Sequence, residues 1–295
     1  MYDFNKLYEP SSVKEALTLK QENPKALFLA GGSDILIKLR NGKYSKCDLI
    51  SIYALDELRG VELDENQNLI IKPLCSFTHV ATSSLIKSHL SVLAEAVEHI
   101  GGPQIRNIGT IGGNICNGVT SADSASTFKA YDAILEIQSA DNKRFLNYAD
   151  FNLAPSKVAL EEDELLTAII IKKESYDQTY GHYIKYAMRK AMDIATLGCS
   201  ANVKLSADKK RLERFRIAFG VAAPTPVRSN SAEEISNGQI IDDKLIEAIG
   251  EAALKDVMPR TSWRASKEFR LHLVKELAKR ATKIAIEKAG GSFNA

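Results

Sequence analysis

Leu27-Phe28-Leu29-Ala30-Gly31-Gly32-Ser33-Asp34 and, much later in the chain, Thr110-Ile111-Gly112-Gly113-Asn114 are the two stretches that decide the fold. Each sets a pair of glycines beside a hydroxyl side chain, in a predicted turn bounded by apolar residues. Glycine has no β-carbon and readily adopts positive φ, so several N–H groups of such a turn can point at one anion. These first and second glycine motifs are therefore predicted to hold a diphosphate from two sides, which indicates a nucleotide cofactor.

Composition limits the class of protein. The 295 residues carry a formal net charge of +2, with 45% hydrophobic and 26% charged residues, which is usual for globular proteins of this size. So small a charge favours neither nucleic acid nor an anionic membrane as a partner. No apolar run reaches the roughly 18 residues of a membrane span, and Met1-Tyr2-Asp3-Phe4 does not begin a signal peptide. The four widely spaced cysteines indicate reduced thiols in a cytoplasmic protein, without a metal site built from this chain.

Strand and helix patterns alternate around the first glycine motif. A capped helix is predicted to start at 11–17, and the apolar run 26–30 predicts a buried strand that ends at the glycines. Residues 33–40 have helical spacing and are followed by Asn41-Gly42, and 48–52 predicts a second strand. This order predicts a small parallel α/β layer.

The rest of the chain has two further patterns. After Gly60 the sequence predicts a hairpin, two helices and two strands, at 61–71, 78–88, 90–100, 133–139 and 165–171. After a polar boundary at 176–180 it predicts three strands and then two helices, at 183–188, 196–205, 215–221, 242–255 and 263–288. Strands followed by helices indicate a separate α+β domain.

The first motif has the order strand, Gly-Gly, Ser, helix. A helix start favours an anion through its free N–H groups and the positive end of its dipole. The spacing is not that of the Gly-x-Gly-x-x-Gly dinucleotide fingerprint, and no phosphate-loop lysine is present. A plain tight turn capped by Ser33 explains the motif equally well. Asp34 is expected in the first helical turn, facing away from the anion.

The second motif offers more polar groups. Thr110 supplies a hydroxyl, Gly112 and Gly113 supply N–H groups, and Asn114 and Asn117 supply donors and acceptors.

Two residues just beyond the motif allow more than one interpretation. Asp123 is placed to accept hydrogen bonds from sugar or ribityl hydroxyls, or else to cap a helix that starts near Ser124. Cys116 is interpreted as a small buried apolar residue.

Together with their flanks, the two motifs resemble the flavin-binding signatures of the FAD-binding subunits of the molybdenum hydroxylases. That family includes xanthine dehydrogenase and carbon monoxide dehydrogenase, and the chain resembles in particular the separate FAD subunits of the bacterial xanthine dehydrogenases. The resemblance covers nearly the whole chain. It extends through the stretches Pro103-Gln104-Ile105-Arg106-Asn107, Tyr183 to Arg189 and Pro259 to Ser266.

The resemblance implies an α+β fold in two parts. Residues 1–176 would form an FAD-binding region of the PCMH type, with lobes at about 1–55 and 56–176. Residues 177–295 would form a C-terminal domain with a three-stranded antiparallel sheet and helices.

The resemblance also implies roles for individual residues. The first motif, Leu27 to Asp34, would wrap one side of the FAD diphosphate and Thr110 to Asn114 the other. Asp123 would bond to the ribityl or flavin end, and Leu166 would pack on the cofactor. Lys185 would lie at the pyrimidine edge of the flavin, where a cation stabilises the negative charge that develops on reduction. From its residue type alone, Lys185 would be a solvated strand lysine.

Two departures from the family pattern bear on the flavin. Related covalent flavoproteins carry a histidine beside the first glycine pair, where this chain has Ser33, so the FAD is expected to be non-covalent. Ile100 occupies the neighbourhood in which some homologues place an aromatic ring over the flavin.

The family implies an electron path. Electrons from a purine, oxidised at a molybdopterin centre, would pass through [2Fe–2S] clusters to this FAD and then, as a hydride, to NAD⁺. The molybdenum and iron–sulfur centres would lie on two partner chains of a hetero-oligomer. The chain itself would supply no catalytic residue and no metal ligand, since the flavin is the redox centre.

Two surface segments each have two interpretations, and the sequence also allows two other functions. Met192-Asp193-Ile194 is interpreted as a loop near the NAD⁺ entrance, or as a plain hairpin turn. The helix from Trp263, with Arg264, Lys267, Arg270 and Lys275, would face a partner or simply solvent. The alternative functions are a free-standing FAD-dependent oxidoreductase of a related fold, and an assembly or binding protein that has lost its cofactor.

Overall fold

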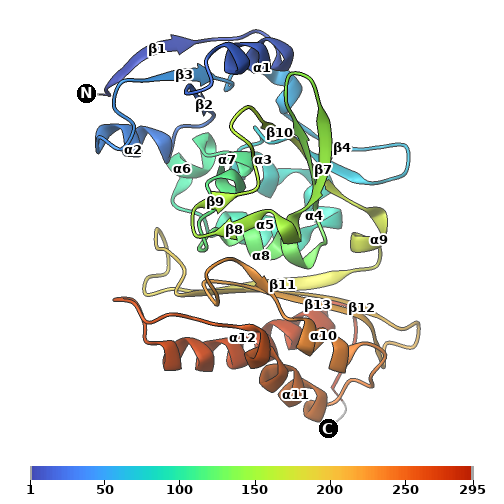
Figure 1. Ribbon diagram of the computed structural model, residues 1–295. Coiled ribbons are helices and arrows are strands. Elements are labelled where there is room, and N and C mark those ends of the chain that lie inside the picture. The colour runs from blue at the N-terminus through green and yellow to red at the C-terminus, as the bar shows by residue number, and fades with distance from the viewer. Residues whose placement is uncertain (1, 294–295) are drawn as a thin grey trace.

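The computed structural model describes residues 2–293, which fold into three successive layers (Figure 1). An N-terminal lobe (residues 4–58, blue) lies on a middle layer (61–176, cyan to yellow-green), and a C-terminal layer (180–288, yellow to red) lies beneath. Each layer contains most of one hydrophobic core. Within the described residues, no helix has both the length and the apolar character needed to cross a membrane.

The N-terminal lobe is a small parallel sheet with two helices, as predicted. Its elements are β1 (Phe4–Tyr8), α1 (Val13–Glu22), β2 (Leu27–Leu29), α2 (Ile35–Arg40) and β3 (Cys47–Ser51), followed by the 3₁₀ turn η1 (Asp56–Leu58). The strand order is β1-β3-β2, with both pairs parallel. The first glycine motif leaves β2 and enters α2, so it lies at the carboxyl end of this sheet.

The middle layer contains a five-stranded antiparallel sheet with the order β4-β5-β10-β6-β7. Its strands are β4 (Val61–Leu63), β5 (Leu69–Ile71), β6 (Ile134–Gln138), β7 (Lys143–Asn147) and β10 (Leu165–Ile171). The predicted hairpin and both predicted strands are confirmed, whereas β7, whose sequence does not alternate polar and apolar residues, was not predicted. A second hairpin, β8 (Asn152–Ala154) with β9 (Lys157–Val158), follows η2 (Tyr148–Asp150).

Short helices surround this sheet. They are α3 (Phe77–Thr82), α4 (Ser84–His89), α5 (Ser91–Glu98), α6 (Pro103–Ile108), α7 (Ile111–Cys116), α8 (Asp123–Ala130) and α9 (Lys173–Tyr176). The single helix predicted at 78–88 was wrong, because Ser83 ends α3 and its side chain accepts a hydrogen bond from Ile86 N–H to cap α4. The hydroxyl thus favours a new helix start over continuation.

The C-terminal sheet has four antiparallel strands, in the order β11-β12-β13-β14, so the predicted three-stranded sheet was wrong. The strands are β11 (Tyr180–Tyr186), β12 (Leu197–Leu205), β13 (Leu212–Gly220) and β14 (Val227–Arg228). The missed strand, β14, has two residues, too few to show an alternating pattern. The helices are α10 (Asn230–Ser236), α11 (Asp243–Ala253), which leads into η3 (Leu254–Asp256), and α12 (Lys267–Lys288).

The C-terminal sheet is covered on both faces. Helices α5 and α8 of the middle layer pack against β11, β12 and β13, and α12 packs against β11 and β12 from the other side (Figure 1). This explains why β12 is buried along almost its whole length. The start of α8 is linked to β11 by two hydrogen bonds that Asp123 accepts, from Tyr183 and from Lys185.

Candidate functional site

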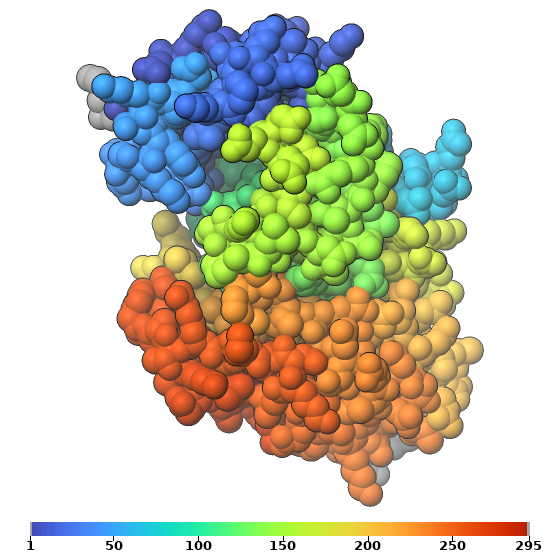
Figure 2. All heavy atoms as spheres, in the orientation of Figure 1, coloured from blue at the N-terminus to red at the C-terminus, as the bar shows by residue number. Residues whose placement is uncertain are grey.

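The two glycine motifs meet because Gly31 has no side chain. A β-carbon on Gly31 would lie 1.9 Å from the carbonyl oxygen of Ile108, just before the second motif. Gly32 has φ +75°, which redirects the chain from β2 into α2. Between the motifs lies a cavity of about 310 Å³, here called the cradle. Figure 2 shows the surface hollowed where the N-terminal lobe (blue) meets the middle layer (green).

Most of the predicted cofactor residues line the cradle. They are Leu27, Phe28, Ala30, Gly31, Gly32, Ser33, Asp34, Thr110, Gly113, Asn114 and Asn117. Six others lie outside its lining: Leu29, Ile111, Gly112, Asp123, Leu166 and Lys185. Leu166 is buried in the core along β10, and its predicted contact with a cofactor stays a prediction.

The first motif provides free donors. Among the described residues, the N–H groups of the five residues 31–35 have no hydrogen-bond partner in the protein. They belong to consecutive residues that line the cradle and lead into α2, where the helix dipole adds a partial positive charge. The first motif is thus a row of backbone donors suited to an anion.

The second motif does not form a turn, and that prediction was wrong. Residues 111–116 form the helix α7, and the Thr110 hydroxyl caps it by accepting a hydrogen bond from Gly113 N–H at 3.1 Å. Gly112 N–H donates to the carbonyl of Pro73 at 2.9 Å. The two glycine N–H groups are therefore already bonded within the protein.

Glycine is required for packing at position 112, whereas at position 113 it borders the cradle. A β-carbon on Gly112 would lie 2.4 Å from Cβ of Pro73, so Gly112 allows α7 to pack against the chain that leads into α3. Gly113 lies on the cradle side, where an added β-carbon would meet only the Thr110 hydroxyl, at 2.8 Å. The second motif hence offers bare surface and side chains rather than backbone donors.

A lysine that the sequence analysis did not select completes the cradle. Lys38, on α2, lines the cavity, and its Nζ donates to Oδ1 of Asn117 at 2.5 Å. The sequence has no phosphate-loop lysine, but the fold brings the ammonium of Lys38 to the cradle. Lys38 lies one helical turn beyond Asp34. This i, i+4 spacing places both residues on one face of the helix, and it is the sequence pattern from which Lys38 could have been predicted as a cradle residue.

Ser33 and Asp34 differ from expectation. Asp34 occupies the N-cap position of α2 without a side-chain capping bond, and it lines the cradle. The sequence predicted it inside the first turn and facing away. Since the cap position belongs to Asp34, the interpretation of Ser33 as a helix cap was wrong. A single ammonium, that of Lys38, offsets the Asp34 carboxylate in the cradle lining.

Apolar side chains form the remaining wall of the cradle. Tyr44, Phe77, Ile100 and Ile105 line it, so the predicted aliphatic Ile100 is accompanied by two aromatic residues that were not predicted. Burial raises the pKa of the Cys116 thiol to about 12, which keeps it protonated, as expected of an unreactive thiol.

Asp123 and Lys185 lie together beyond the cradle. Lys185 Nζ donates to Oδ2 of Asp123 at 2.9 Å, and both side chains are buried. Burial raises the pKa of Asp123, although Lys185 and the Tyr183 hydroxyl oppose the rise. The predicted capping role was wrong, because Ala122 is the N-cap of α8 and Asp123 makes no capping bond.

A second cavity, of about 490 Å³, lies between the middle and C-terminal layers. Three arginines, Arg260, Arg264 and Arg270, contribute to its lining, and no carboxylate among the described residues does. Arg270 is buried and has its pKa lowered by that burial and by the other two arginines. Trp263, which is 76% exposed, also lines this cavity, here called the arginine cavity. The guanidinium carbon of Arg264 lies 4.1 Å from the centre of the Trp263 ring.

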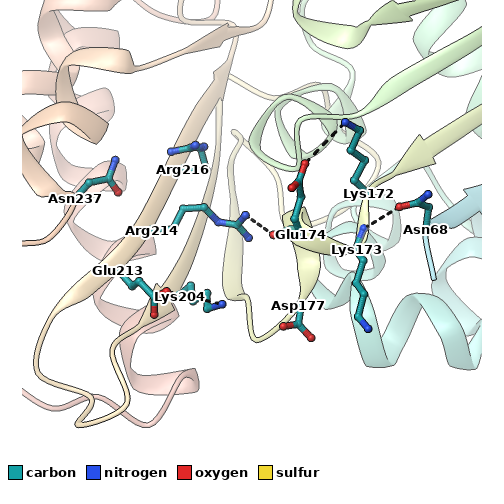
Figure 3. Close-up of a pocket in the computed structure, with 10 residues that line it drawn as sticks. All are labelled: Asn68, Lys172, Lys173, Glu174, Asp177, Lys204, Glu213, Arg214, Arg216 and Asn237. Atoms are coloured by element: carbon teal, nitrogen blue, oxygen red, sulfur yellow. Dashed lines mark hydrogen bonds and ion pairs between the residues drawn. The ribbon is translucent and has the colours of Figure 1, made fainter. Parts of the chain in front are cut away.

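A larger cavity, of about 930 Å³, lies at another junction of the two layers and contains none of the predicted site residues (Figure 3). Its charges are mixed and largely engaged: Lys172 faces Glu174 at 3.9 Å, and Arg214 donates to the Glu174 carbonyl and to Thr179. Size therefore does not mark the functional site here. The cradle, with its free donors, is the better candidate.

Comparisons with known proteins agree with this geometry. Residues 2–172 match the family model described as "FAD binding domain in molybdopterin dehydrogenase", and residues 182–285 match "CO dehydrogenase flavoprotein C-terminal domain". The two models together span the three layers of the fold.

Individual relatives cover nearly the whole chain. The xanthine dehydrogenase FAD-binding subunit of Escherichia coli O157:H7 is 44% identical over 99% of this chain and 100% of its own length. The carbon monoxide dehydrogenase medium chain of Hydrogenophaga pseudoflava is 28% identical over 94% of this chain and 96% of its own. A solved structure of carbon monoxide dehydrogenase from that organism superposes with a TM-score of 0.91, at 27% identity, over 98% of this chain and 99% of the other.

Proposed function

This chain belongs to the family of FAD-binding subunits of the molybdenum hydroxylases, and we propose that it binds one FAD non-covalently in the cradle as the flavin subunit of a xanthine dehydrogenase-like complex. The observation that carries the proposal is the row of five free N–H groups at residues 31–35, which faces a cavity shared with the second motif. A diphosphate is the ligand group that best matches such a row.

The cradle residues fit that cofactor. The free N–H groups of the first motif and the ammonium of Lys38 would hold the diphosphate. The amide oxygen of Asn114 accepts a hydrogen bond from the Ser124 hydroxyl at 2.7 Å. This bond leaves the NH₂ group of Asn114 to donate to a ligand. Lys185 would bring positive charge to the flavin. FAD, when bound, supplies two-electron redox chemistry, and the protein positions and tunes it.

Partner chains follow from the family. Relatives are named as medium chains or subunits of larger enzymes, which supports a hetero-oligomer with a molybdopterin chain and a [2Fe–2S] chain. The described residues contain no group of three or more His, Cys, Asp or Glu side chains placed to hold a metal ion. All four cysteines are free thiols, which suits the cytoplasm. The proposal divides the chain into an FAD-binding region, 1–176, and a C-terminal domain, 177–295.

NAD⁺ is the proposed electron acceptor, and the arginine cavity supports it. A dinucleotide needs cationic groups for its diphosphate and an aromatic or apolar surface for its bases. The arginine cavity offers three guanidinium groups without a carboxylate, together with the exposed ring of Trp263. Ile194 of the predicted NAD⁺ loop lines this cavity, while Met192 and Asp193 line a neighbouring one.

A visible spectrum and a partner-dependence assay test the proposal. The purified full-length chain, incubated with FAD and desalted, is expected to keep one flavin, with excess ADP competing and riboflavin not. NADH is expected to bleach the flavin, with no purine oxidation until the partner chains are added. A chain that retains no flavin contradicts the proposal, and substrate turnover by the chain alone would favour a free-standing oxidoreductase.

A further inference from the structure

Tyr183 joins Asp123 and Lys185 in one buried network. The Tyr183 hydroxyl donates to Oδ1 of Asp123 at 2.7 Å, and Lys185 Nζ donates to Oδ2 at 2.9 Å. Lys185 Nζ also donates to the carbonyl of His99 at 2.9 Å. Each oxygen of the Asp123 carboxylate thus has its own donor, one from each of two β11 residues.

Tyr183 is firmly held. Its side chain is 2% exposed, and its backbone N–H donates to Oε2 of Glu95 at 3.1 Å. Its ring extends over β12, where a β-carbon on Gly198 would lie 2.9 Å from the hydroxyl oxygen. Burial and the Asp123 carboxylate hold the pKa of Tyr183 well above its usual range, so the hydroxyl keeps its proton and remains the donor.

The number of N–H donors on Lys185 determines whether one of them is available to a ligand. An ammonium has three N–H donors, and two of those on Lys185 are taken by Asp123 and His99. Among the described residues Lys185 has no third partner. If Oδ1 of Asp123 lost its phenol donor in this dry site, the unsatisfied oxygen would attract the third donor of Lys185.

We propose that Tyr183 is a positioning residue of the flavin site: by occupying one oxygen of Asp123, it leaves one N–H of Lys185 for the cofactor. The inference rests on the proposed function, because it needs FAD beside Lys185. A cation that is free to bond to the cofactor favours the reduced, more negative form over the oxidised form. Tyr183 acts through Asp123 and Lys185, and its removal shifts that preference.

The test is the midpoint potential of the FAD-loaded full-length chain. Tyr183→Phe is expected to weaken the preference for reduced over oxidised FAD about tenfold, which lowers the two-electron midpoint by about 30 mV. Its Kd for oxidised FAD should stay within about threefold of wild type, a change of less than about 1 kcal/mol. In the Asp123→Asn background, Tyr183→Phe should have little further effect, because the carboxylate through which it acts is gone.

Two further variants keep the test decisive. Gly198→Ala retains the phenol but displaces its hydroxyl, and is expected to lower the potential in the same direction, so it replaces Tyr183→Phe if that variant does not fold. Tyr176→Phe is the matched control, since Tyr176 is also buried and, among the described residues, donates its hydroxyl only to the carbonyl of Gln67.

Three outcomes overturn the inference: potentials of both Tyr183→Phe and Gly198→Ala equal to wild type, an equal drop in Tyr176→Phe, or an undiminished drop in the Asp123→Asn background. Wild-type protein that binds no FAD would instead contradict the proposed function, so the two failures are distinguishable.

Discussion

The α-carbon of Gly31 lies directly against the carbonyl oxygen of Ile108, where a β-carbon would come within 1.9 Å. The contact joins the loop after β2 to the end of α6, two backbones from different layers of the molecule. Because the obstructing atom is a backbone oxygen, no rotamer change can relieve the clash. The cradle thus exists only with glycine at this position.

Gly31→Ala is therefore expected to separate the two motifs. We predict that FAD affinity falls by roughly 100-fold, about 2.7 kcal/mol, as measured by fluorescence titration of the full-length chain. Gly220→Ala is the control, since a β-carbon there would have its nearest contact, the Thr120 carbonyl, at 3.4 Å. Equal affinities of Gly31→Ala and wild type would contradict the packing argument.

Lys38 is predicted to contribute to diphosphate binding. Lys38→Met removes the ammonium but keeps an unbranched chain, and is expected to weaken FAD binding about tenfold, or about 1.4 kcal/mol. The wild-type affinity should also fall more steeply with salt concentration than that of the variant. Arg40→Met, an exposed position on the same helix, should change neither quantity. An equal loss of FAD affinity in Arg40→Met would show that Lys38 does not act through its place in the cradle.

Arg264 is predicted to act on the electron acceptor. Its Nε is buried and has no partner among the described residues, so a bound anion would satisfy it. Arg264→Gln is expected to raise the KM for NAD⁺ about tenfold, the loss of one charged hydrogen bond of roughly 1.5 kcal/mol, while the rate with an artificial dye acceptor stays unchanged. Arg280→Gln, on the exposed face of α12, is the control. A parallel loss of activity with the dye would place Arg264 elsewhere in the mechanism.

Glu95 is predicted to stabilise the junction of the layers in a pH-dependent way. Burial opposes its ionisation, yet hydrogen bonds from His182, Lys288 and the Tyr183 N–H lower its pKa to about 2. Because the pKa is lower in the folded than in the unfolded state, its contribution is complete above about pH 4.5 and is lost as the pH falls towards about 2.

Glu95→Gln should thus lower the free energy of unfolding by about 2 kcal/mol at pH 7, and the difference from wild type should narrow below pH 4.5. Urea unfolding at several pH values measures this. Glu251→Gln, which removes an exposed partner of Lys275, should cost less than about 1 kcal/mol. A pH-independent difference for Glu95→Gln would disprove the electrostatic origin.

Local pattern predicted the parts of this fold that bury apolar residues. The parallel layer around the first motif, the middle strands β6 and β10 and the long helix α12 all have clear periodicity. Strand β1 was missed because four of its five residues are exposed. Helix α7 was missed because two adjacent glycines disfavour a helix locally, and only its packing against Pro73 explains them.

The sequence assigned candidate site residues one by one, but it did not predict the contacts between them. Asp123 and Lys185 were each assigned to the flavin separately, and their ion pair depends on α8 packing against the sheet that contains β11. The contribution of Lys38 likewise depends on α2 reaching Asn117 across the cradle. Such pairings between distant segments leave no trace in the spacing of a single sequence.

The ion pair between Asp123 and Lys185 also joins two parts of the chain that match different family models. Asp123 and both glycine motifs belong to the stretch 2–172, whereas Lys185 belongs to the stretch 182–285, and separate family models match them. If the proposed function holds, recombination at the intervening segment would keep the residues that bind the cofactor and replace the charged residue beside it. A lineage built this way can adjust the electron affinity of its flavin without rebuilding the site that holds it.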